Sequence, residues 1–196
     1  MKKIFSLAIF VLLMAIAICY AHDKSYYAFY PSAKGNEYKE FRHNIFGFSI
    51  DMPSIWTFGV VNKDNLPVVL LYPDGLDTGK FTDSYETMEI GLIPERSISL
   101  EEAQKYVLDG MKAGHAGYKI LKEPHATRFS EQAGRAFIAL WVSKTGFSIY
   151  EYISLIPYKD QIRTICVRTT FNPQKNLKLY DDIINSYKAF DQMEKF

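Results

Sequence analysis

Residues 135–171 read RAFIALWVSKTGFSIYEYISLIPYKDQIRTICVRTTF and hold most of an expected antiparallel sheet. Strands are expected over 135–143, 147–156 and 161–171. In the second of them Phe147, Ile149, Ile153 and Leu155 recur with the period of two that is typical of one strand face. Thr145-Gly146 joins the first two of these strands as a hairpin. Strands connected by short turns pair antiparallel, so we expect the three to lie side by side.

A helix is expected before this region, over residues 100–113. Ser99 and Glu102 form a capping box, in which each side chain accepts a hydrogen bond from the backbone N–H of the other residue. We expect Gly114 to end the helix in a left-handed conformation, and a further strand to follow over 118–128. Apolar residues recur at helical spacing, at Leu100, Ala103, Val107 and Met111.

A second helix is expected after the sheet region. Asn172-Pro173 caps and opens it, because proline is favoured in the first turn of a helix. Its apolar stripe comprises Leu177, Tyr180, Ile184 and Tyr187. Two amphipathic helices must bury their stripes against the faces of a sheet. The expected fold class is therefore α+β, an antiparallel sheet with a helix on one or both faces.

The region before the first helix predicts further strands. Phe46, Phe48, Ile50 and Met52 alternate on one face of a strand that ends at Pro53. Two shorter strands are expected over 68–72 and 87–93. The polar stretch between them, residues 73–84, is expected to be a long mobile loop.

Three features of residues 41–190 resemble the PsbP-like superfamily, which includes bacterial DcrB-like exported proteins. They are Phe48-Ser49-Ile50-Asp51-Met52-Pro53 followed by Trp56, the helix that interrupts the sheet, and a closing Ser186-Tyr187-Lys188-Ala189-Phe190. The resemblance implies an α/β/α sandwich with a central antiparallel sheet. It also implies an accessory or binding role, but family partners differ widely and no functional residue carries over.

Residues 1–21 have the layout of a secretory signal peptide. Lys2 and Lys3 precede an apolar run from Ile4 to Cys19, and Ala21 offers a cleavage site. Ala15-Ile16-Ala17 is an alternative site. An uncleaved membrane anchor and lipidation of Cys19 are the rival interpretations.

Residues 22–40 are interpreted as a connecting segment and 41–196 as the PsbP-like domain. The segment contains five aromatic residues, which we expect to pack on the outside of the domain. The alternative is a membrane-proximal aromatic stretch. After cleavage Cys166 is the remaining cysteine, and it is expected to be a buried core residue without a disulfide.

Charge and motifs exclude several classes of function. The chain has 23 Lys and Arg against 22 Asp and Glu, so nothing attracts it to nucleic acid. Catalytic motifs, phosphate loops and metal-ligand spacings are not found, so no catalytic residue, cofactor or metal is expected. His115 and His125 could meet only if the chain folds back between them.

Glu151 is the most informative single residue, because it interrupts an apolar strand face formed by Phe147, Ile149, Ile153 and Leu155. A carboxylate in a core is costly unless it is paired. Glu151 is expected to pair with Arg135, Arg163 or Arg168. Alternatively, the opposite face of the strand is the buried one, or the sheet opens at Glu151 into a ligand cleft.

An aromatic platform is the second candidate binding feature. It would combine Trp141 with Tyr150, Tyr152 and Tyr158 as a partner surface. Ordinary packing between a helix and the sheet is the alternative explanation.

The expected function is that of a non-enzymatic exported protein of the periplasm or cell envelope. It would bind or stabilise a protein or small ligand there. A small hydrolase or ligand-binding enzyme using Glu151 or Asp51 in a cleft is the first alternative. The second is a membrane-anchored structural subunit, which requires the N-terminal segment to be retained.

Overall fold

The computed structural model describes residues 27–63, 66–75, 86–170 and 173–190. The expected signal peptide, Cys19, most of the 73–84 loop and Asn172 lie outside these residues. Among the described residues, no helix has the length and apolar character needed to cross a membrane.

A large sheet contains the strands expected from the sequence. Its seven strands pair antiparallel throughout, and the expected strands over 87–93, 118–128, 135–143, 147–156 and 161–171 are confirmed as β6, β7, β8, β9 and β10. The order across the sheet is β4 (Trp56–Lys63), β5 (Leu66–Pro73), β6 (Thr87–Leu92), β10 (Gln161–Thr169), β9 (Ser148–Tyr158), β8 (Gln132–Val142) and β7 (Lys119–Phe129).

A second, four-stranded antiparallel sheet was not expected. Its order is β1 (Tyr27–Pro31), β2 (Tyr38–His43), β3 (Phe48–Pro53) and β11 (Lys188–Ala189). The part of the expected connecting segment that the structure describes therefore belongs to the sheet. Tyr27 and Phe29 place their rings 4.5 and 6.0 Å from the ring of Phe58 on β4, in agreement with the packing interpretation.

Both expected helices are present, as α2 (Leu100–Gly114) and α3 (Pro173–Ile184). The capping box of Ser99 and Glu102 is confirmed. The expectation for Gly114 is wrong, because the helical hydrogen bonding continues to His115, whose N–H donates to the Met111 carbonyl over 3.0 Å. The left-handed glycine is Gly117, with φ of 66°.

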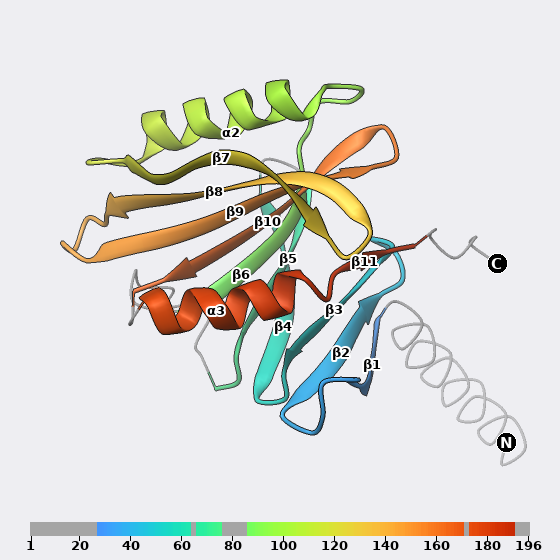
Figure 1. The fold of residues 1–196 in the computed structure, drawn as a ribbon. Coiled ribbons are helices and arrows are strands. Elements are labelled where there is room, and N and C mark those ends of the chain that lie inside the picture. Colours follow the sequence, from blue (N-terminus) through green and yellow to red (C-terminus); the bar gives the residue numbers. More distant parts are fainter. Residues whose placement is uncertain (1–26, 64–65, 76–85, 171–172, 191–196) are drawn as a thin grey trace, which may run out of the picture.

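The large sheet is covered on both faces, as Figure 1 shows. Helix α2 packs on one face through Ala103 and half-buried Leu100, Val107 and Met111. Helix α3 and the small sheet cover the other face, where Phe48, Ile50, Met52, Tyr180, Ile184 and Tyr187 are buried. The α+β class is confirmed. The α/β/α sandwich is not confirmed, because β1, β2 and β3 form a sheet that shares the second face with α3.

Candidate functional site

A cavity of about 760 Å³ lies between α2 and the large sheet. Tyr106, Val107, Met111 and His115 contribute to its wall from α2 and its C-terminal end, and the floor is formed by β6, β9, β10 and the end of β4. Cavities of this volume are typical of small-molecule sites.

Strand alternation decides which side chains of β10 face the cavity. Thr164, Cys166 and Arg168 line it. Arg163, Ile165 and Val167 point to the opposite face, where Ile165 and Val167 join the core beneath α3. In register, Arg168 lies opposite Glu151 of β9, and Cys166 lies opposite Glu89 of β6.

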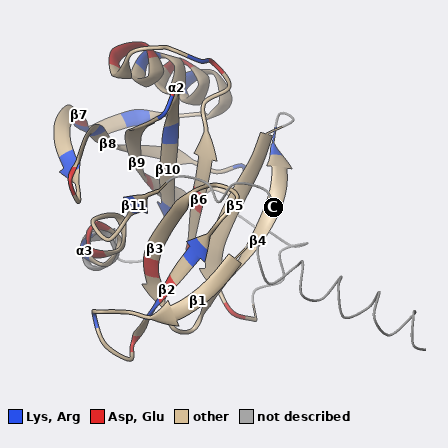
Figure 2. Cartoon of the chain, turned by 90° about the vertical axis from the view of Figure 1, so that its right-hand side faces the viewer, with Lys and Arg blue, Asp and Glu red and all other residues tan. Residues whose placement is uncertain are grey.

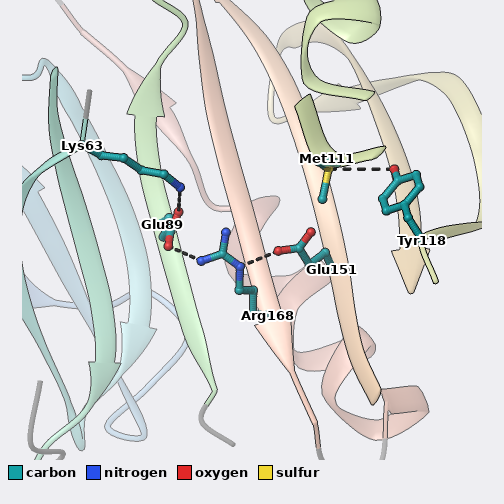
Figure 3. A network of polar contacts seen from close by, with 6 residues as sticks. All are labelled: Lys63, Glu89, Met111, Tyr118, Glu151 and Arg168. Atoms are coloured by element: carbon teal, nitrogen blue, oxygen red, sulfur yellow. Dashed lines mark hydrogen bonds and ion pairs between the residues drawn. The ribbon is translucent and has the colours of Figure 1, made fainter. Parts of the chain in front are cut away.

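Four charged side chains form a continuous ion network on the cavity side of the sheet (Figure 3). Arg168 donates from Nε to Glu151 Oε1 and from Nη1 to Glu89 Oε1. Lys63 Nζ donates to Glu89 Oε2 over 3.4 Å. Opposite charges thus alternate from β4 to β9, and Lys63, Glu89 and Arg168 line the cavity itself.

The network keeps the carboxylate of Glu89 ionised at neutral pH. Burial opposes ionisation of Glu89, but Arg168 and Lys63 outweigh it and hold the pKa of Glu89 below its usual value. Arginine remains protonated at any physiological pH. A carboxylate as buried as Glu151 needs such a partner.

The expected ion pair of Glu151 with an arginine is confirmed, and the partner is Arg168. Its side chain is 0% exposed, and within the described part of the chain its Oε2 has no hydrogen-bond partner. The other two candidate arginines bind elsewhere: Arg135 pairs with Glu101 of α2, and Arg163 contacts Tyr187. The opposite face of β9 is also buried at Ser154 and Ile156, so β9 is covered on both sides.

The prediction that Trp141 and the tyrosines of β9 form one aromatic platform is wrong. Directly opposed residues in an antiparallel pair share a face, and Trp141 lies opposite Ile149, whereas Tyr150 and Tyr152 lie opposite Leu140 and Ile138. Trp141 therefore points to the α2 face, and the two tyrosines point to the other. Trp141 instead stacks on His115 with ring centroids 4.0 Å apart.

Cys166 is half-buried and lines the cavity, so its expected place in the closed core is only partly confirmed. Burial, together with the nearby carboxylate of Glu151, raises the pKa of the thiol well above its usual value. A protonated thiol is a poor nucleophile. Burial also lowers the pKa of His115, which keeps its imidazole neutral at neutral pH.

Asp51, the other proposed cleft carboxylate, lies on β3 of the small sheet. Its backbone N–H donates to Ser186 Oγ over 2.7 Å, and it does not line this cavity. Among the described residues, no group of three His, Cys, Asp or Glu side chains could hold a metal ion.

Several cavity residues were missed by the sequence reasoning. Glu89 lies between Met88 and Ile90, but these core residues belong to the opposite face of β6. Its neighbours on its own face are Thr87 and Gly91, so it does not interrupt an apolar face as Glu151 does. Lys63, Thr164 and Met111 carry no local signal of a site, because only the packing of α2 over β10 and β6 brings them together.

The large antiparallel sheet is covered on both faces, and a cavity lies under one of its helices. These features define the class: an α+β protein with a candidate binding site. The sequence matches no protein-family model and no curated protein. The fold is similar to that of cyanobacterial PsbP (CyanoP) from Synechocystis sp. PCC 6803, with a TM-score of 0.51 and 13% identity over 84% of this chain and 92% of that chain.

It is also similar to the Ran-binding protein Mog1p of Saccharomyces cerevisiae, with a TM-score of 0.51 and 11% identity over 84% of this chain and 96% of that chain. Identities this low establish the fold alone. The chain has the PsbP-like fold, and the resemblance noted in its sequence is confirmed at that level.

Proposed function

We propose that this protein is a non-enzymatic binding protein of the cell envelope that takes a small ligand in the cavity between α2 and the large sheet. The observation that carries the proposal is the cavity of about 760 Å³ with an ion network in its floor. A cavity with an apolar lining and a few convergent polar groups is the usual form of a ligand site. The PsbP-like fold serves binding in Mog1p, which binds Ran.

The charged groups of the cavity are arranged for binding rather than for proton transfer. Glu89 is compensated by two cations, and Cys166 has a raised thiol pKa. A general acid or base needs a pKa near the working pH, and a nucleophilic cysteine needs a lowered one.

One observation favours an enzymatic alternative, since Cys166 and His115 line the same cavity. An activated thiol needs a hydrogen bond to its base. Within the described residues no hydrogen bond joins Cys166 to His115, whose ring stacks on Trp141 instead. Replacing Cys166 by Ala separates the hypotheses. In the binding proposal the thiol is one of several apolar contacts, so the affinity is expected to fall about fivefold at most. A catalytic thiol would be indispensable for turnover.

Export to the envelope is supported by the sequence of residues 1–21. N-terminal sequencing of the protein from the envelope fraction is expected to begin at His22. An intact Met1 would support the membrane-anchored alternative, and an acylated Cys19 would support lipidation.

Native mass spectrometry of the protein purified from its own envelope fraction tests the binding function. We expect a bound small-molecule mass beyond that of the polypeptide. Val107→Trp fills the cavity from α2 and is expected to remove that mass. Leu121→Trp is the matched control, because Leu121 is 50% exposed on β7 and does not line the cavity. A bound mass that survives Val107→Trp would contradict the proposed site.

A further inference from the structure

The cavity has an apolar strip under α2, beside the charged Glu102, Lys105 and Asp109 of the same helix. Val107 and Met111 face it from the helix, and Ile153 faces it from β9. Cys166 adds a thiol that its raised pKa keeps uncharged, so it behaves as a small hydrophobic group. A ligand that fills this part needs an apolar body of matching size.

The floor of the cavity also carries two cations around one carboxylate (Figure 3). Arg168 is held in place by Glu89 and Glu151, and its side chain is still 26% exposed. Lys63 is 57% exposed and has a single described partner, Glu89, at 3.4 Å. Lys63 is therefore free to turn toward an incoming group at little cost, because exposed ion pairs of this kind are weak.

The carboxylates that line the cavity are already engaged. Glu89 accepts from both Lys63 and Arg168. On α2, where acidic and basic residues are interspersed (Figure 2), Glu102 accepts from the Ser99 N–H and Asp109 pairs with Lys105 over 3.0 Å. An incoming cation would have to displace these partners. An incoming anion can instead take Lys63, whose single described partner lies 3.4 Å away, and Arg168 Nη2, for which no partner is described.

We propose that the ligand is a small amphipathic anion, with its anionic head on Lys63 Nζ and Arg168 Nη2, beside the carboxylate of Glu89, and its apolar body between α2 and the sheet. This inference rests on the proposed function and goes beyond it by naming the chemical class of the ligand. The donors that remain, Lys63 Nζ and Arg168 Nη2, suit carboxylate, sulfonate and phosphate heads because charge-assisted hydrogen bonds to these oxygens are strong.

Two fluorescent probes separate the head from the body. 8-Anilinonaphthalene-1-sulfonate and N-phenyl-1-naphthylamine share an aromatic body, and only the first carries a sulfonate. Both are titrated into the full mature protein at low ionic strength. We expect the sulfonate to bind roughly 10-fold more tightly, as two favourable charge contacts at a partly exposed site allow. The preference is expected to shrink at about 0.5 M salt because of screening.

Matched variants identify the groups that hold the head. Lys63→Gln is expected to weaken sulfonate binding about fivefold and to leave the neutral probe unchanged. Lys112→Gln removes an exposed lysine of α2 that does not line the cavity, and it should change neither affinity. Val107→Trp should abolish binding of both probes. Urea unfolding of each variant confirms that it is folded.

The outcomes distinguish this inference from the function on which it rests. Equal affinities for the two probes, both lost in Val107→Trp, would overturn the anionic class and leave the cavity as a binding site. Failure of both probes to bind, or binding that Val107→Trp does not affect, would overturn the cavity site as well. Equal losses in Lys63→Gln and Lys112→Gln would contradict the assignment of the head to Lys63.

Discussion

Two arginines five residues apart on β10 show how differently the two faces of the large sheet are built. Arg163 is 1% exposed on the face covered by α3 and the small sheet. It donates to Tyr187 Oη over 2.8 Å and to the Phe46 carbonyl, and it stacks 3.9 Å from the Tyr158 ring centre. Arg168, on the α2 face, is held by the carboxylates of Glu89 and Glu151 and borders the cavity.

The difference separates a packing role from a binding role. On the closed face, neutral oxygens and aromatic rings surround the guanidinium, which ties Tyr187 to the centre of the sheet. On the open face, carboxylates orient the guanidinium without covering it. A charge that is fixed but still accessible is what recognition of a charged ligand requires.

Arg168→Met is expected to cause the largest loss of stability, about 4 kcal/mol in the free energy of unfolding. The substitution leaves Glu151 with no exposure and no counter-ion, which is the costly way to break a buried pair. Urea unfolding monitored by circular dichroism measures it. A loss below about 1 kcal/mol would show that Glu151 does not depend on Arg168.

Acid should destabilise the closed face through His43. Burial, and then the nearby Arg163 cation, lower the pKa of His43 to about 4 in the folded protein. The unfolded chain, with its ordinary histidine pKa of about 6.5, binds the proton more readily, so the stability present above pH 6.5 is lost as the pH falls toward 4.

The expected loss over this window is about 3 kcal/mol. His43→Phe keeps the stacking on Phe46, whose ring centroid lies 4.2 Å away, and removes the titrating group. Unfolding at pH 7 and pH 4.5 should therefore differ less in this variant than in the wild-type protein. An unchanged difference would show that other groups cause the acid sensitivity.

Glu151→Gln tests the open face from the carboxylate side, with an expected loss of about 2 kcal/mol. The loss is smaller than for Arg168→Met because Arg168 keeps Glu89 as a partner. Thermal unfolding measures it. A variant as stable as the wild-type protein that no longer binds the sulfonate probe would assign Glu151 to the site instead of to the support of Arg168.

Arg163→Met is expected to have the smallest effect, about 1 kcal/mol, although Arg163 is the more buried arginine. A similarly long apolar side chain replaces it, and the change leaves neutral oxygens rather than a carboxylate without a donor. Urea unfolding of Arg163→Met and Arg168→Met side by side tests the contrast between the faces. Equal losses in the free energy of unfolding would contradict the proposed difference between the two faces.

The fold could be predicted where the signals are local. Strand-like segments bounded by turns in residues 118–171 and the capping box at Ser99 led to four neighbouring strands and α2, because these signals depend on adjacent residues. The small sheet could not be predicted in the same way. Its β11 pairs with β3 across more than 130 residues of sequence. Strand β1 and part of β2 lie in residues 22–40, where Pro31, Gly35 and Asn36 indicated a connecting segment.

The site could be predicted only at Glu151, because a carboxylate among apolar neighbours on one strand face is unusual. The cavity depends on the position of α2 over β6 and β10. No local sequence pattern in α2 indicates where the helix lies on the sheet. The prediction of an aromatic platform was wrong because it required the register between β8 and β9. The sequence places the tyrosines along β9 but does not give the residue that lies opposite Trp141.

Methionine methyl groups report on the two faces most directly. Met111 lines the cavity, whereas Met52 and Met88 are fully buried beneath the opposite face. In the methyl-¹³C NMR spectrum of the mature protein, saturation with 8-anilinonaphthalene-1-sulfonate is expected to shift the Met111 resonance and to leave those of Met52 and Met88 in place. Shifts at Met52 or Met88 with none at Met111 would contradict the assignment of binding to the α2 face.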